Sequence, residues 1–157
     1  MSALPRPSRE TVFSTLFTLL QTAAGFETYS RRMLDYSEIA PRLLPCLILW
    51  ELHGEVDRTG VGLRREWWDA MLVGVFQNPS RPQNGDPTTA TAGATILNPL
   101  LDSVSAALEA DNPFTNELTL GGLVQWVRIE GKLVVETGDT DADGRGGFIL
   151  PLRILVP

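Results

Sequence analysis

Two stretches of the chain are apolar at nearly every position, and they constrain the fold more than any other feature. Cys46 to Leu52 is one stretch, and Trp67 to Phe76 is the other, broken only by Asp69. Strands covered on both faces have such continuous apolar runs, whereas strands with one wet face alternate. Residues 53–66 between them are largely polar and hold three glycines. We therefore expect two central strands of one sheet, joined by a hairpin loop or a longer excursion.

Two further segments have the apolar spacing of amphipathic helices. From Ser8 to Ala24 apolar residues recur every three or four positions, with a serine to cap the start and Gly25 after the end. A second apolar stripe follows in residues 97–110. Its start has two interpretations. In the first interpretation, Asn98 is the cap and Pro99 is the first helical residue. In the second, the helix begins a turn earlier and tolerates the proline.

The remaining segments predict shorter strands. One covers Tyr29 to Met33. Leu123 to Glu130 and Leu133 to Thr137 flank the tripeptide EGK and predict a tight hairpin. The last strand runs from Phe148 to Val156, and Pro151 in its middle argues for an edge position or a bulge, because proline has no donor for the ladder.

Residues 78–94 have no periodicity and predict a long mobile loop or arm. They contain prolines at positions 79, 82 and 87 and glycines at 85 and 93, and unstructured loops of this length are usually functional or disordered. The order of elements predicts an α+β fold, with one mainly antiparallel twisted sheet and two helices packed on it. Residues 1–8 are expected to form a flexible leader, and residues 9–157 a single domain.

The composition predicts a soluble domain with no membrane partner. No run of 18 apolar residues exists, and the single Cys46 lies in an apolar stretch, as expected for a buried thiol in a reducing compartment. The net charge of −6 argues against a domain that grips nucleic acid, because that binding depends on Lys and Arg neutralising phosphates.

The motifs of common enzymes are missing from the sequence. His53 is the only histidine, and no G-x-S-x-G, phosphate-binding loop or dinucleotide-binding motif accompanies it. We therefore expect no catalytic residues and no cofactor. A small enzyme that uses His53 or an aspartate cluster remains the competing hypothesis.

The decapeptide GDTDADGRGG places Asp139, Asp141 and Asp143 at alternate positions before Gly144, as an EF-hand calcium loop does. The twelfth position of such a loop holds a bidentate glutamate, and here it is Leu150. Strands rather than helices are also expected on both sides. A strand-connecting loop is therefore preferred over a metal site, and its aspartates are expected on an exposed loop.

Three tryptophans lie in the two apolar stretches, and each fits either the core or a subunit interface. The adjacent Trp67 and Trp68 must face opposite sides of the sheet. The residues expected at an interface with another subunit or protein lie in the second central strand, just before it, and in the arm. They are Arg64, Arg65, Trp67, Trp68, Arg81, Asn84 and Asp86.

From about Arg9 to Pro157 the chain resembles the tail terminator, or tail completion, proteins of long-tailed bacteriophages. The resemblance rests on the segments RETVFSTLFTLLQTAAGFETYSRRM, IAPRLLPCLILWELHGE, ILNPLLDSVSAALEA and VETGDTDADGRGGFILPLRILVP, in that order. It implies a small α+β subunit that forms a ring, expected to be a hexamer, and performs no catalysis.

The resemblance also implies where such a ring works. It would cap the finished tail tube, contact the tail tube protein and the head-tail connector, and let DNA pass through its lumen. The protein would then belong to the virion, at the head-proximal end of the tail, after assembly in the host cytoplasm. A head-tail connector or neck protein is the alternative, and a small calcium-binding module using the three aspartates is a further one.

Overall fold

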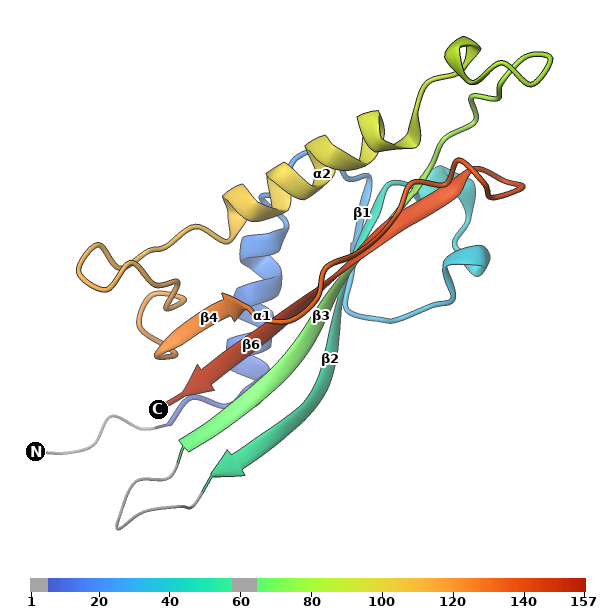
Figure 1. Cartoon of the computed structure of the whole chain (residues 1–157). Helices are drawn as coiled ribbons and strands as arrows, with labels where there is room; N and C mark the ends of the chain where they lie inside the picture. Colours follow the sequence, from blue (N-terminus) through green and yellow to red (C-terminus); the bar gives the residue numbers. More distant parts are fainter. Residues whose placement is uncertain (1–5, 58–64) are drawn as a thin grey trace, which may run out of the picture.

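The computed structural model describes residues 6–57 and 65–157 and has an α+β fold (Figure 1). A six-stranded, mostly antiparallel sheet carries two helices, and it is not closed. The helices are α1 (Arg9–Leu20) and α2 (Gly93–Ala107), and the strands are β1 (Thr28–Ser30), β2 (Cys46–Asp57), β3 (Arg65–Gln77), β4 (Trp126–Ile129), β5 (Val134–Glu136) and β6 (Arg145–Val156). Short 3-10 turns occupy Tyr36–Glu38, Pro41–Leu43 and Pro87–Thr89. Within the described residues, neither helix is long and apolar enough to span a bilayer.

The two apolar stretches form the interior of the sheet, as expected. The strand order is β1-β2-β3-β6-β4, and β5 also pairs with β6. β3 is antiparallel to both β2 and β6, whereas the short β1 lies parallel to β2 at the edge. The connection between β2 and β3 therefore joins two antiparallel neighbours, and its loop, residues 58–64, lies outside the described residues.

The helices begin and end at different residues from those predicted. Ser8 caps α1 as expected, because its hydroxyl accepts a hydrogen bond from the backbone N–H of Thr11 at 3.0 Å. α1 ends at Leu20, and a turn leads to Gly25, whose φ of 93° is positive. α2 begins at Gly93, so the interpretation with Asn98 as the cap is wrong, and Pro99 lies inside the helix.

The predicted hairpin around EGK is wrong. β4 and β5 are both antiparallel to β6, so they run in the same direction and lie one after the other along a single edge. The chain between them makes a detour at Gly131, where φ is 130°, and does not reverse. Two strands that continue one another cannot form a hairpin.

Of the two settings predicted for Pro151, an edge position or a bulge, the edge position is wrong, because β6 lies inside the sheet between β3 and the β4–β5 edge. The carbonyl of Pro151 accepts a hydrogen bond from the backbone N–H of Glu130 at 3.1 Å, so the proline nitrogen faces the same edge. β4 has ended there and β5 has not begun. The missing donor of proline therefore coincides with the detour, and the ladder loses no bond.

Apolar side chains pack on both faces of the sheet. The main cluster lies between the sheet and the two helices, and it contains Phe13, Leu16, Trp68, Phe76, Leu97, Val104, Phe148 and Ile154 among others. A smaller cluster lies on the opposite face under residues 33–44 and contains Ile39, Cys46, Ile48, Val73 and Val75. Cys46 is a free thiol in this smaller cluster, and its burial raises its pKa. Only part of the second face is covered in this way.

Candidate interaction surface

Three of the four tryptophans lie on the sheet face opposite α1 and α2. This face also holds the smaller cluster, and the three tryptophans lie outside that cluster. Trp68 packs in the main core, so its neighbour Trp67 points to the opposite face. Trp67 pairs with Leu155 across the sheet, and Leu155 pairs with Trp126, which places the two indoles on one face. Trp50 belongs to the same face, because it alternates with the buried Leu49 of the main core. We call this surface the open face, and its members are Trp50, Trp67, Asp69, Met71, Trp126, Arg128, Val134, Ile149 and Arg153.

Three charged residues, Asp69, Arg153 and Arg128, are in register on neighbouring strands of the open face, between the tryptophans. Asp69 accepts a hydrogen bond from Nε of Arg153 at 2.9 Å, and this contact raises the pKa of Arg153. Arg128 is in register with Arg153 on the next strand, and its guanidinium lies over the ring of Trp126 at 4.3 Å. Glu117 accepts a hydrogen bond from Nε of Arg128 at 3.1 Å, which lowers the pKa of Glu117.

Ion pairs at a surface contribute only about 0–1 kcal/mol each to stability. Their effect here is to hold the arginines of the open face in fixed positions beside half-exposed tryptophans. Tryptophan and arginine are the residues most enriched at the centres of protein interfaces. The open face therefore has the composition of a protein-binding surface, and sequence reasoning had not singled out Trp126, Arg128 or Arg153 for this role.

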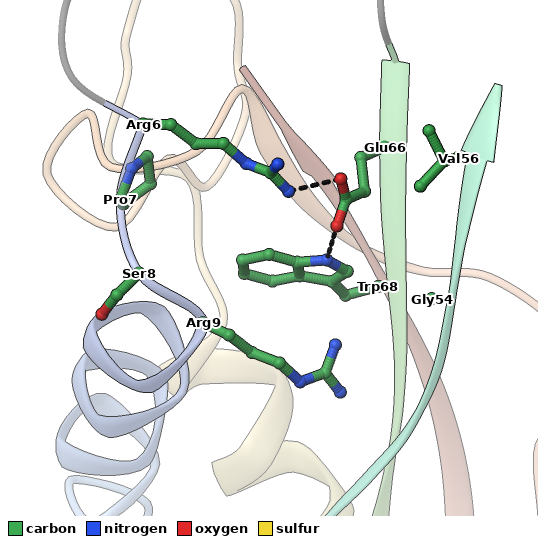
Figure 2. A pocket seen from close by; sticks show the side chains of 8 residues that line it. All are labelled: Arg6, Pro7, Ser8, Arg9, Gly54, Val56, Glu66 and Trp68. Carbon is green, nitrogen blue, oxygen red and sulfur yellow. Dashed lines mark hydrogen bonds and ion pairs between the residues drawn. The ribbon is translucent and has the colours of Figure 1, made fainter. Parts of the chain in front are cut away.

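A second feature is a cleft of about 520 Å³ between the N-terminal segment and strands β2 and β3 (Figure 2). The indole of Trp68 lies in it, and its Nε1 donates a hydrogen bond to Glu66 at 2.6 Å. Arg6 forms an ion pair with the same carboxylate. Arg9 lies over the indole with its guanidinium 5.2 Å from the ring centre. We call Arg6, Arg9, Glu66 and Trp68 the N-terminal clasp.

The interface role expected for Trp68 is wrong. Only 4% of this residue is exposed, and its ring stacks on Phe13 of α1 with 6.1 Å between the ring centres. Trp68 is therefore a core residue and not an interface residue. Of the leader expected at residues 1–8, residues 6–8 lie against this cluster, and residues 1–5 are outside the described part.

The chemistry of the clasp is that of an intramolecular contact. Arg9 donates a hydrogen bond to the carbonyl of Leu52 at 2.7 Å and lies 3.7 Å from a carboxylate oxygen of Glu51. Arg6 is neutralised by Glu66. Both positive charges are thus matched by carboxylates of β2 and β3, and the clasp joins the start of α1 to the β2–β3 pair.

The aspartate loop joins β5 to β6, as expected, and its carboxylates bind backbone N–H groups. Oδ1 of Asp139 accepts a hydrogen bond from the N–H of Gly93 at 2.8 Å. Oδ2 of Asp141 accepts hydrogen bonds from the N–H groups of Asp143 at 3.0 Å and Arg145 at 2.9 Å. Asp139 therefore satisfies an orphan donor at the start of α2, which explains why the helix begins at Gly93.

The expected arm packs against the aspartate loop. Arg81 donates hydrogen bonds to the carbonyls of Ala142 at 2.8 Å and Asp141 at 3.3 Å. The side chain of Asn78, a residue only 3% exposed, donates to the carbonyl of Thr91 at 2.8 Å. The arm projects beyond the sheet at the same end as the aspartate loop (Figure 1). Arg81, expected at an interface, thus has partners within its own chain.

The other predicted interface residues are spread over two regions. Arg64 lies outside the described residues, and Arg65 is exposed at the start of β3. Asn84 and Asp86 form the tip of the arm, where Asn84 has a positive φ of 52°. Hydrogen bonds from the hydroxyl and the N–H of Thr88 lower the pKa of Asp86. Arg65 lies two positions before Trp67 in β3 and therefore on the same face of the sheet, whereas Asn84 and Asp86 lie in the arm that follows the other end of β3.

The described residues gather no candidate metal site. Within residues 6–57 and 65–157, no three His, Cys, Asp or Glu side chains lie where they could hold a metal ion. His53 is exposed near the irregularity of β2, between Glu51 and Gly54. Asp139 and Asp141 already bind backbone groups on different elements.

Replacing Asp141 with alanine should lower the free energy of unfolding by about 1–2 kcal/mol, because two backbone donors lose their acceptor. Asp143→Ala, at an exposed carboxylate of the same loop, is the matched control and should change stability by less than about 0.5 kcal/mol. Urea unfolding measures both. If millimolar calcium raised the melting temperature of the unchanged protein and either substitution removed that rise, the loop would be a calcium site instead.

No protein-family model matches the chain, and no curated protein matches it.

Proposed function

We propose that the protein is a structural virion subunit that caps the completed tube of a phage tail as a ring and provides the surface for head-tail joining. The observation that carries the proposal is the open face, where three tryptophans and ordered arginines remain accessible on a sheet whose other face is covered by helices. Such a surface suits protein contacts, because aromatic and arginine side chains bury large areas with defined geometry.

Two other properties support an assembly role. Among the described strands the sheet ends at β1 on one side and at β4–β5 on the other, where Val127 also bridges to Leu118, and these two edges can meet different surfaces of neighbouring copies. The charge of −6 would disfavour adhesion of DNA that passes through a lumen, since phosphates are repelled by an acidic lining. The aspartate loop and the arm, at one end of the sheet, are candidates for such a lining.

Electron microscopy of the protein, alone and mixed with tail tubes, tests this proposal. We expect ring-shaped particles at one end of the tubes, and tubes of incomplete or excessive length when the gene is lost. Rings at the portal of filled heads, with none on tubes, would favour a connector protein. A protein that stays monomeric and does not bind tail tubes would contradict the proposal.

The open face can be tested separately by substitution. Trp50→Lys should abolish ring formation while the chain still folds, because Trp50 is 39% exposed and a lysine there would place a positive charge in the contact surface. Gln21→Lys, an exposed residue after α1, adds the same charge on the helix side and should leave rings unchanged. Circular dichroism checks the fold, and electron microscopy counts the rings. Rings that persist in Trp50→Lys would contradict the role of the open face.

A further inference from the structure

Phe114 is a large apolar side chain with 96% of its surface exposed. It lies in the loop of residues 109–117, between α2 and β4. The other exposed large apolar residues of the described chain are between 36% and 48% exposed. Exposing a whole aromatic ring to water is unfavourable, and such side chains are frequent anchors of interfaces. The loop therefore presents a single aromatic knob.

Hydrogen bonds hold the knob in place. Oδ1 of Asn112 accepts from the N–H of Phe114 at 2.9 Å, and the carbonyl of Asn112 accepts from the N–H of Asn116 at 2.9 Å. Asp111 accepts from the N–H of Thr119 at 2.6 Å and from that of Gly121 at 2.8 Å. A knob that is already ordered loses little conformational freedom when it binds.

An apolar pocket of about 270 Å³ lies on the open-face side of the sheet. This volume is below the ~300–1,000 Å³ of small-molecule sites, so it suits one side chain better than a ligand. The glycines Gly146 and Gly147 line it with backbone atoms alone, because neither carries a side chain. Its walls also include Tyr36, Val73, Val75, Val134, Glu136 and Ile149.

The knob and the pocket are at opposite ends of the sheet. Pocket residues lie at the start of β6, at positions 146–149, whereas the knob loop joins β4 through the bridge between Leu118 and Val127, opposite Ile154. About seven strand residues, or roughly 20 Å, separate these positions along β6. Figure 1 shows the knob loop at the left end and residues 31–43 at the right. The knob cannot enter the pocket of its own chain.

We propose that Phe114 of one copy inserts into the pocket of the next copy, in a head-to-tail contact. A contact between two different surfaces of one chain repeats around a ring when the rotation closes, and does not stop at a pair. This inference rests on the proposed function, because it names how copies of the ring subunit meet. An aromatic side chain buries about 150–250 Å², and a stable interface needs ~800 Å² per partner. Exposed apolar side chains of the pocket wall, which are Tyr36, Val134 and Ile149, add to the area that the knob buries.

Cross-linking of two different single-cysteine variants tests the direction of the contact. Thr115→Cys, beside the knob, and Val134→Cys both replace exposed residues and keep Phe114, and the native Cys46 is only 3% exposed. A bifunctional thiol reagent should join a mixture of the two variants into covalent dimers. Each variant alone should give few dimers, because a head-to-tail contact brings position 115 of one copy to position 134 of the next. Links between two copies of Thr115→Cys alone, or no links in the mixture, would overturn the inference.

Sedimentation velocity on the full chain measures the contribution of the knob. Phe114→Ser should weaken self-association at least about tenfold, as loss of a central anchor does. Val56→Ser is the control, since Val56 is 44% exposed far from the pocket, and it should change little. If Phe114→Ser associates as strongly as the unchanged protein, Phe114 does not anchor the contact between copies, and the ring proposal is unaffected. If the cross-links form but the protein does not bind tail tubes, the knob contact stands and only the proposed tail function is wrong. A monomeric chain that gives no cross-links contradicts both the knob contact and the ring.

Discussion

Trp68→Ala should lower the free energy of unfolding by about 3–5 kcal/mol, the usual cost of removing a large aromatic side chain from a core. The side chain is 4% exposed and stacks on Phe13, so its removal leaves a cavity between α1 and β3. The substitution also leaves Arg6 and Arg9 of the N-terminal clasp without the ring that they cover. Urea denaturation followed by circular dichroism measures the effect.

Trp67→Ala is the matched control, because it removes the same side chain from the neighbouring position on the open face. We expect it to cost clearly less, since Trp67 is only partly buried in the single chain. Its main effect should be on self-association. Equal losses of stability for the two substitutions would contradict the assignment of Trp68 to the core and of Trp67 to the interaction surface.

Gly93→Ala should lower the free energy of unfolding by about 1–3 kcal/mol, as overpacking does. Alanine is favoured over glycine in a helix by up to about 1 kcal/mol, so helix propensity alone predicts the opposite sign. A Cβ at position 93 would lie 1.7 Å from the carbonyl oxygen of Thr137 and 3.0 Å from Oδ1 of Asp139. The start of α2 must then move away from the aspartate loop.

Asn98→Ala is the control for helix propensity, because Asn98 is exposed in the same helix. It should leave the stability unchanged or raise it by a few tenths of a kcal/mol. Thermal unfolding of both variants under one set of conditions makes the comparison. A more stable Gly93→Ala protein would mean that α2 and the aspartate loop are not in contact at this point.

The elements with long apolar patterns were predictable, and their ends and partners were less so. The central strands and α1 follow from continuous or helical apolar spacing. The start of α2 was not decided by local signals, because its first N–H is satisfied by Asp139, 46 residues away. Pro151 was misplaced for a similar reason, since only the position of the β4–β5 detour shows that no donor is lost.

The candidate surface was predictable in part. Alternation along a strand is enough to place Trp67 and Trp68 on opposite faces, but it does not say which face the helices cover. Trp126, Arg128 and Arg153 join Trp67 only through the pairing of β4 and β6, a long-range register that local sequence does not encode. Phe114 carried no periodic signal at all, because its exposure depends on the hydrogen-bonded loop that holds it.

The sequence by itself determined the α+β class and the two buried strands, because these depend on residues that are neighbours along the chain and on the burial of continuous apolar runs. The tertiary structure alone decided that the arm, the aspartate loop and the start of α2 form one packed end of the molecule. It also decided which tryptophans stay accessible. These features depend on contacts between segments far apart in the chain. The energies of such contacts cannot be predicted from a local sequence pattern.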